Sequence, residues 1–231
     1  MSKIRNYLVG ISGETGGGKT TLLNDLKNVA EGKDYEVYVS GAKISRKVQA
    51  ELGVQNVTEF VHSSLDNMLD FQLRIALELA ATCKHLISTP MHMVTDKTVV
   101  MLQERTFIDI AAFTLMWGMK SKEINGDLAR MTDAQIEVYG KVMNTCVAGQ
   151  HLFDGVIYVP RHDGIPDEGD PNRTLDEYRN EWRFLYNRLR GLDFMESTHN
   201  TPRHKLIAVS PEMRAIEAKL FLEECLQQWK C

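Results

Sequence analysis

A run of glycines that ends in a lysine and a hydroxyl residue is the strongest chemical signal in the sequence. The segment Gly13-Glu14-Thr15-Gly16-Gly17-Gly18-Lys19-Thr20 matches the pattern G-x-x-x-x-G-K-[ST] in full. Glycines let backbone N–H groups turn inward around an anion, and the start of a following helix favours negative charge. The lysine can reach the outer phosphates of a nucleotide, and Thr20 can place a hydroxyl on Mg²⁺. Together with Thr21, these residues predict a cradle for ATP and Mg²⁺.

A second polar pair follows an apolar run that is predicted to be a strand, 98–103. Glu104 and Arg105 come directly after it. Ligands of open parallel sheets bind beyond the carboxyl ends of the strands, so this pair should face the phosphate cradle. The Glu104 carboxylate can hold Mg²⁺ or take a proton from an acceptor, and Arg105 can hold a phosphate or the attacking oxygen. The alternative interpretation is a surface ion pair at the end of a strand.

Arginines also gather in and just after a loop-like stretch, 161–174, which is rich in Gly, Pro, Asp and Asn and lacks apolar periodicity. Arg179 lies on the helix that is expected to follow, from about Asp176 to Arg190. Guanidinium groups suit the spread negative charge of a transferring phosphoryl group, and a mobile cover would exclude water. We therefore expect a short lid over 161–179, with Arg173 and Arg179 acting on the transferred group. The alternative is a solvated loop whose acidic residues neutralise the arginines.

These groups need a scaffold, and the sequence predicts an α/β fold. Short apolar runs alternate with segments of helical periodicity, which favours a five-stranded parallel sheet with helices on both faces. The predicted strands are 7–11, 35–40, 98–103, 155–159 and 205–209. The longest predicted helix covers 64–83, and Ser45 is expected to cap a short helix that ends near Gly53. One domain over 1–231, carrying the lid, suits this length.

Bulk properties restrict the classes of function. The chain has 231 residues with a net charge of −4, and its pI is about 6.0. A protein that wraps nucleic acid is usually basic, so the overall charge disfavours tight DNA binding. The four cysteines show no C-x-x-C spacing, which disfavours a zinc site or a disulfide framework. The apolar run near the N-terminus is too short for a signal peptide, and we expect a soluble, cytoplasmic protein without a membrane partner.

Two classes of nucleotide-binding protein are disfavoured by missing motifs. GTPases need a D-x-x-G and an [NT]-K-x-D element, and the sequence contains neither. Motor ATPases usually end a later strand in a doubled acid, whereas the strand 98–103 is followed by Glu104 and Arg105. A kinase remains, because a phosphate loop identifies the nucleotide but not the task.

The segment that begins at Glu104 resembles known kinases. It reads Glu-Arg-Thr-Phe-Ile-Asp-Ile-Ala-Ala-Phe, similar to the thymidylate-kinase signature and to the Glu-Arg-Ser of deoxynucleoside kinases. Within the P-loop nucleoside and nucleotide kinase superfamily, the strongest resemblance is to the NadR-like AAA-type kinases common in phages. That group has an arginine after the second strand, a Phe-Gln pair on the long helix and Asp-Arg-x-x-x-Asp after the third strand. The matching positions here are Arg46, Phe71, Gln72, Arg105 and Asp109.

The resemblance implies a P-loop kinase fold with strand order 2-3-1-4-5 and an acceptor bound by these five residues. It also exposes two departures. The acid before the arginine is usually Asp, whereas Glu104 reaches further. Deoxynucleoside kinases carry an acidic base at the end of the second strand, but 40–43 reads Ser-Gly-Ala-Lys here. Glu104 is therefore the candidate base and Mg²⁺ ligand, with Asp109 in reserve.

The expected activity is transfer of the γ-phosphate of ATP to a nucleoside or nucleotide. A second possible acceptor is a hydroxymethylated pyrimidine in phage DNA, such as 5-hydroxymethyluridine. The acidic pI opposes this alternative, although several cations could contact DNA: Lys43, Arg46, Lys47, Lys120 and Lys122. A third alternative is an ATPase switch without an acceptor, which the lid arginines and the pair Glu104-Arg105 disfavour. The sequence does not indicate an oligomeric state.

Overall fold

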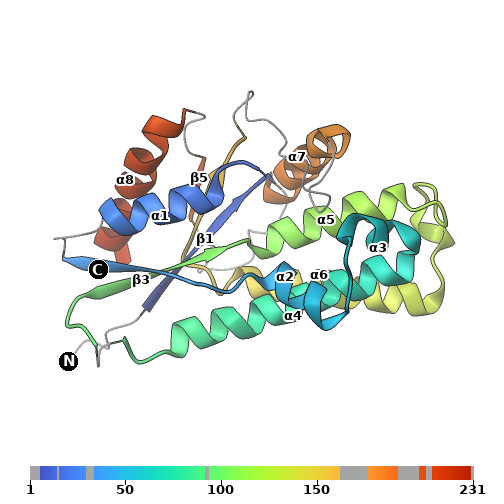
Figure 1. Cartoon of the computed structure of the whole chain (residues 1–231), viewed down its shortest axis with the longest axis horizontal. Helices are drawn as coiled ribbons and strands as arrows, with labels where there is room; N and C mark the ends of the chain where they lie inside the picture. The colour runs from blue at the N-terminus through green and yellow to red at the C-terminus, as the bar shows by residue number, and fades with distance from the viewer. Residues whose placement is uncertain are drawn as a thin grey trace.

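The computed structural model describes residues 6–14, 16–29, 34–91, 94–161, 176–191, 203–206 and 210–229. Parallel strands form one sheet in the order β2-β3-β1-β4-β5, which is the order that the resemblance implies (Figure 1). The strands are β1 (Asn6–Gly13), β2 (Tyr35–Val39), β3 (Thr98–Glu104), β4 (Gly155–Val159) and β5 (Arg203–Leu206). The fifth strand begins two residues before the predicted 205–209, and 207–209 lie outside the described residues.

The central strand, β1, determines where chemistry can take place. It pairs with β3 on one side and β4 on the other, with Ile11 opposite Glu104 and Gly13 opposite Val159. The carboxyl ends of three neighbouring strands therefore meet where β1 leads into the phosphate loop (13–20). This is the edge at which open α/β sheets bind their ligands.

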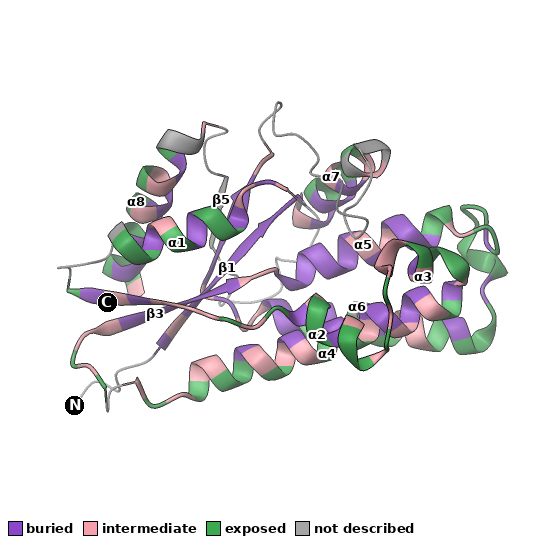
Figure 2. Cartoon of the chain, in the orientation of Figure 1, coloured by how far each residue is buried: buried purple, intermediate pink, exposed green. Residues whose placement is uncertain are grey.

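Helices cover both faces of the sheet. On one face lie α1 (Lys19–Val29) and α8 (Pro211–Trp229), and on the other lie α4 (Leu65–Ser88), α5 (Phe107–Lys120) and α6 (Asp133–Gln150) (Figure 1). Alternate strand residues point to opposite faces, so Leu8 packs with α4 and α5 while Val9 packs with α1 and α8. Both faces are apolar, and Figure 2 shows the strands largely buried. This confirms the α/β prediction.

The shorter elements show where local sequence signals failed. Ser45 was expected to cap α2 (Ile44–Glu51), but Lys43 is the N-cap residue and Ser45 lies in the first turn. The helix α3 (Val57–Ser63) was not predicted, because seven residues are too few to establish a period of 3.6. It begins at a regular cap, in which the Asn56 side chain accepts a hydrogen bond from the Glu59 N–H. The remaining helical elements are η2 (Leu128–Arg130) and α7 (Asp176–Gly191).

Other predictions can be compared with the described part of the chain. Thr132 and Gln135 form a capping box at the start of α6, as the motif [ST]-x-x-[EQ] in the sequence predicts. Cys83 and Cys146 are buried and free, Cys225 is buried, and Cys231 lies outside the described residues. No helix within these residues has both the length and the apolar character needed to cross a membrane.

The packing of α6 against α5 gives a test of this arrangement. A Cβ added at Gly149 would overlap the buried ring of Phe107, whereas one added at Gly140 on the same helix would meet no atom. Gly149→Ala is therefore expected to lower the free energy of unfolding by about 1–3 kcal/mol. Gly140→Ala, the matched control, should raise it by about 0.5–1 kcal/mol. Urea denaturation measures both, and equal effects of the two substitutions would contradict the packing.

Candidate active site

The phosphate loop connects β1 to α1 through backbone conformations that require glycine. Gly13 has φ 140° and Gly18 has φ 84°, values that side-chain-bearing residues rarely adopt. A Cβ at Gly13 would also collide with the carbonyl oxygen of Val159 on β4. A turn is closed by the Gly17 N–H, which donates to the carbonyl of Glu14 at 3.1 Å. Thr15, which was predicted to bind the nucleotide, lies outside the described residues.

Lys19 lies inside this loop. Its ammonium donates to the carbonyl oxygens of Gly13 (2.9 Å) and Glu14 (2.6 Å) and is 9% exposed. Burial lowers the pKa of Lys19 below its usual value, and the nearby Glu104 carboxylate acts in the opposite direction. The lysine is thus held at the centre of the loop, where the motif predicts it.

The side chain of Glu14 does not face the cradle, although Glu14 was predicted to bind the nucleotide. Its carboxylate is 1% exposed and accepts two hydrogen bonds from Arg183 of α7, at 2.6 and 2.9 Å. The Tyr158 hydroxyl donates a third bond at 3.4 Å. A bidentate guanidinium pair is a strong, directional contact, so Glu14 anchors the loop to α7. What remains for a phosphate at this position is the backbone.

A second arginine braces the loop from the other face of the sheet. Arg214 of α8 is 5% exposed and donates to the carbonyls of Gly17 and Pro160, both at 2.5 Å. Burial lowers the pKa of its guanidinium. Sequence analysis missed Arg214. Its position in the sequence could have indicated this role, because Arg214 lies in the first turns of the helix that follows the last strand, beyond the carboxyl edge of the sheet.

Asp109 lies behind the loop and not in a cavity. Its carboxylate is 1% exposed and accepts four hydrogen bonds, from the Ser12 hydroxyl, the Gly13 N–H and both the N–H and the hydroxyl of Thr106. Burial raises the pKa of this carboxyl group. The predicted contact with an acceptor and the reserve role as base do not fit this position, because the group is enclosed and fully engaged.

Glu104 and Thr20 meet beside Lys19. The Thr20 hydroxyl donates to a carboxylate oxygen of Glu104 at 3.4 Å. Mg²⁺ is commonly held by one or two protein oxygens together with phosphates and water, and this oxygen pair fits that need. Among the described residues, no group of three or more His, Cys, Asp and Glu side chains could hold a metal. Thr20 and Glu104 are the predicted metal ligands, and the structure places their oxygens next to each other.

Arg105 adopts a strained backbone. Its φ is 74°, in the left-handed region, and its N–H donates to the Ile11 carbonyl at 2.9 Å. This conformation costs a residue with a Cβ about 1–2 kcal/mol, and such strain tends to occur at functional positions. The guanidinium lies over the ring of Phe113, with 5.6 Å between its central carbon and the ring centroid. The strained turn directs the cation of Arg105 away from the sheet and towards α5.

A cavity of about 650 Å³, the acceptor cavity, joins these groups to the predicted acceptor residues. Its walls are the phosphate loop, the first turn of α2, α3, α4, α5 and the end of β3. The predicted site residues that line it are Lys19, Thr20, Arg46, Phe71, Gln72, Glu104 and Arg105 together with Gly16. Segments far apart in the sequence thus bring these eight predicted residues together.

Two lining residues of α4 differ in character. Phe71 is 3% exposed and packs edge-on against Phe60, so it belongs to the core as well as to the wall. Gln72 is 5% exposed, and its amide makes no hydrogen bond to any residue that the structure describes. A buried amide that lines a cavity without a partner is suited to hydrogen-bond a ligand.

Besides Asp109 and the loop residues Gly13, Glu14, Thr15, Gly17 and Gly18, three predicted residues are not placed at the cavity by the described structure. Arg173 lies outside the described residues. Arg179 belongs to α7, but its side chain is not described. Thr21 is exposed on α1 and does not line the acceptor cavity.

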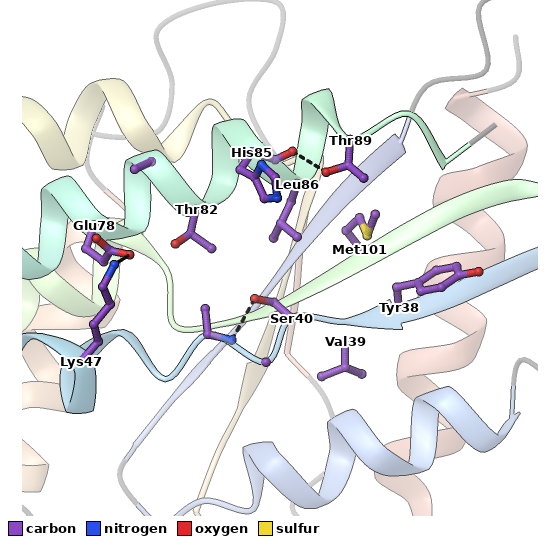
Figure 3. Close-up of a pocket in the computed structure, with 13 residues that line it drawn as sticks. Tyr38, Val39, Ser40, Lys47, Glu78, Thr82, His85, Leu86, Thr89 and Met101 are labelled. Carbon is purple, nitrogen blue, oxygen red and sulfur yellow. Dashed lines mark hydrogen bonds and ion pairs between the residues drawn. The ribbon is translucent and has the colours of Figure 1, made fainter. Parts of the chain in front are cut away.

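A second cavity, of about 680 Å³, lies between the edge strand β2 and α4 (Figure 3). Ser40, Thr82, His85 and Met101 are among its lining residues, and the ion pair of Lys47 with Glu78 borders it at 2.6 Å. It contains no residue of the phosphate loop. None of the residues predicted for the site from the sequence lines this second cavity.

The backbone strain at Arg105 predicts an unusual order of stabilities. Arg105→Gly should have a free energy of unfolding about 1–2 kcal/mol higher than Arg105→Ala, because glycine tolerates a positive φ. Arg74, in the middle of α4, is the control, and there the glycine variant should be about 1 kcal/mol less stable than the alanine variant. Urea titrations of the four variants measure both differences. The same order at both sites would argue against strain at Arg105.

The similarity of this chain to known proteins is one of fold and not of sequence. No protein-family model and no curated protein matches the sequence. A thymidylate kinase from Candida albicans superposes with a TM-score of 0.60 at 13% identity, over 95% of this chain and 92% of the other. Deoxyadenosine kinase from M. mycoides, solved with bound dCTP, gives 0.57 at 14% identity, over 94% and 99%. The chain therefore has the fold that these two kinases share.

Proposed function

We propose that the chain transfers the γ-phosphoryl group of ATP to a nucleoside or nucleotide bound in the acceptor cavity. The observation that carries the proposal is that one cavity is lined both by Lys19 and Thr20 of the phosphate loop and by Phe71 and Gln72 of α4. Its volume, about 650 Å³, lies within the range of small-molecule sites. A donor and an acceptor can thus share one enclosed space.

The donor half of the mechanism rests on the phosphate loop. Loop N–H groups and Lys19 would bind the β- and γ-phosphates, while Thr20 and Glu104 would hold Mg²⁺. When bound, Mg²⁺ supplies positive charge that offsets the charge developing on the phosphates. Arg183 and Arg214 keep the loop in place through Glu14 and Gly17.

Transfer itself requires positioning and positive charge more than covalent chemistry. Arg105, beyond the end of β3, lines the cavity and can bind the transferred group or the attacking oxygen. That Arg173 and Arg179 close over the transferred group is still a prediction from the sequence. The kinship with NadR-like kinases of phages likewise stays a prediction from the motifs.

The acceptor half of the cavity suits a nucleobase. Phe71, Phe113 and Trp117 provide aromatic walls, and flat rings favour stacked or edge-on contacts. The Gln72 amide offers one donor group and one acceptor oxygen that are not used by described residues. An amide beside aromatic walls can read the edge of a base while the rings exclude water.

A base within DNA is supported less well as the acceptor. Such a base must leave its stack, and its backbone must meet several cations on one surface. Lys47 pairs with Glu78, and Lys120 pairs with Glu181 at 2.7 Å. Two of the five cations considered for DNA contact are thus engaged within the protein. An ATPase switch, in turn, would have no use for an acceptor cavity.

The direct test incubates the chain with γ-labelled ATP and Mg²⁺ and a panel of acceptors. The panel contains nucleosides, their monophosphates and oligonucleotides with hydroxymethylated pyrimidines. We expect label in a nucleoside or nucleotide. Label only in the oligonucleotides would support the DNA alternative, and release of inorganic phosphate with every acceptor would support the switch.

Lys19→Ala should lower kcat by about 10²–10³-fold or more, because it removes a preorganised cation from the transferring phosphates. The circular dichroism spectrum should stay unchanged, because hydrogen bonds from Arg183 to Glu14 and from Arg214 to Gly17 still hold the loop. Lys27→Ala, near the exposed end of the same helix, is the control and should keep wild-type activity. A Lys19→Ala variant within about tenfold of wild type would contradict the assignment.

Glu104→Gln should raise the Mg²⁺ concentration needed for half-maximal rate by about 10–100-fold, because an amide is a weaker metal ligand than a carboxylate. Saturating Mg²⁺ should then restore most of kcat. The measurement is kcat as a function of Mg²⁺ at saturating ATP. A kcat that stays low at every Mg²⁺ concentration would instead indicate that Glu104 takes a proton from the acceptor.

A further inference from the structure

The charges that line the acceptor cavity are unbalanced. Lys19, Lys43, Arg46 and Arg105 contribute four cations, whereas Glu104 is the only carboxylate among the lining residues that the structure describes. Within the described part of the chain, Lys43, Arg46 and Arg105 make no ion pair with a carboxylate. A cleft lined by one sign of charge concentrates ligands of the opposite sign. The cavity therefore favours an anionic ligand on the acceptor side as well as on the donor side.

The first turn of α2 adds uncharged donors at the same place. Ile44, Ser45 and Arg46 line the cavity, and the first intrahelical bond reaches back from the Lys47 N–H to the Lys43 carbonyl. The N–H groups before Lys47 thus have no acceptor within the helix, and the first turn contains no acid to neutralise the helix dipole.

Ser45 gives an independent indication that this turn binds a ligand. Its hydroxyl oxygen is shielded from solvent but has no hydrogen-bond partner among the described residues. Buried hydroxyls nearly always have a partner, and an unsatisfied one in a cavity wall calls for an explanation. A bound anion would accept hydrogen bonds from this hydroxyl and from the N–H groups of the turn. It would also pair with the cations of Lys43 and Arg46.

Among the described residues that line the cavity, Glu104 is the only candidate base for a hydroxyl acceptor. A hydroxyl group must lose its proton during transfer, which calls for a nearby carboxylate or imidazole. Glu104 lies on the donor side, beside Thr20, and Asp109 is enclosed behind the loop. A phosphate monoester needs no such base, because its second pKa is about 6 and its oxygens are already ionised at neutral pH.

We propose that Lys43, Ser45 and Arg46 form a subsite for a phosphate group of the acceptor, so that the substrate is a nucleoside monophosphate. This inference rests on the proposed kinase function. A phosphate oxygen of the acceptor forms the new bond to the γ-phosphorus. The bond from that phosphorus to the β–γ bridging oxygen breaks, and its electron pair leaves with ADP. The products are ADP and a nucleoside diphosphate, and no proton has to be removed.

The first test compares each nucleoside with its own 5′-monophosphate in the presence of ATP and Mg²⁺. We expect the monophosphate to react at least about a hundredfold faster in kcat/KM, as two charge-assisted contacts predict. Equal or faster reaction of the nucleoside, or transfer only to hydroxymethylated oligonucleotides, would overturn the subsite while leaving kinase activity established. Absence of transfer to every acceptor would instead overturn the proposed function.

The second test measures binding and does not depend on turnover. The double variant Lys43→Ala/Arg46→Ala should weaken calorimetric binding of a nucleoside monophosphate by at least about tenfold, and leave binding of the matching nucleoside unchanged. Both side chains are exposed, so the variant should fold.

Lys47→Ala is the matched control, because Lys47 lies next to Arg46 on α2 but borders the second cavity and pairs with Glu78 (Figure 3). The control should bind the monophosphate as the wild type does. Unchanged binding by the double variant, or an equal loss in the control, would overturn the subsite even if no transfer is detected.

Discussion

The hydrogen bonds accepted by the buried carboxylate of Asp109 are the contact on which the site depends. They join Ser12 and Gly13, where β1 passes into the phosphate loop, to Thr106, which directly follows Arg105. This side chain therefore ties the phosphate loop to the segment that carries Arg105, in addition to the pairing of β1 with β3. Losing a donor here would leave a buried carboxylate incompletely bonded, which is costly because water cannot replace the donor.

Local patterns predicted much of the scaffold and the chemistry of the loop. The strands are continuous apolar runs, and the loop motif needs only eight consecutive residues, so both are visible in the sequence. The Arg183 and Arg214 contacts connect residues 169 and 197 positions apart, and no spacing rule reaches that far. Asp109 was placed at the site for a related reason, since its position after the third strand is visible in the sequence but the direction of its side chain is not.

The prediction that Ser45 caps α2 was wrong, and the reason is physical. Serine is a common N-cap residue, so the helix was expected to begin there. The N-cap residue of α2 is instead Lys43, whose side chain does not cap the helix, and the Ser45 hydroxyl has no described hydrogen-bond partner. A local rule is broken at the cavity wall, and departures of this kind concentrate where a protein binds ligands.

The hydrogen bonds of Arg183 and Arg214 to the phosphate loop determine when the loop loses its conformational freedom. A glycine-rich segment has much entropy to lose on ordering, and here α7 and α8 hold it through Glu14 and Gly17 during folding. Under the proposed function, nucleotide affinity would then not be reduced by the cost of arranging the loop, because the loop is already ordered. Inherited or engineered damage to α8, at the far end of the chain from the glycine motif, would consequently appear as weak nucleotide binding even though every residue of that motif is intact.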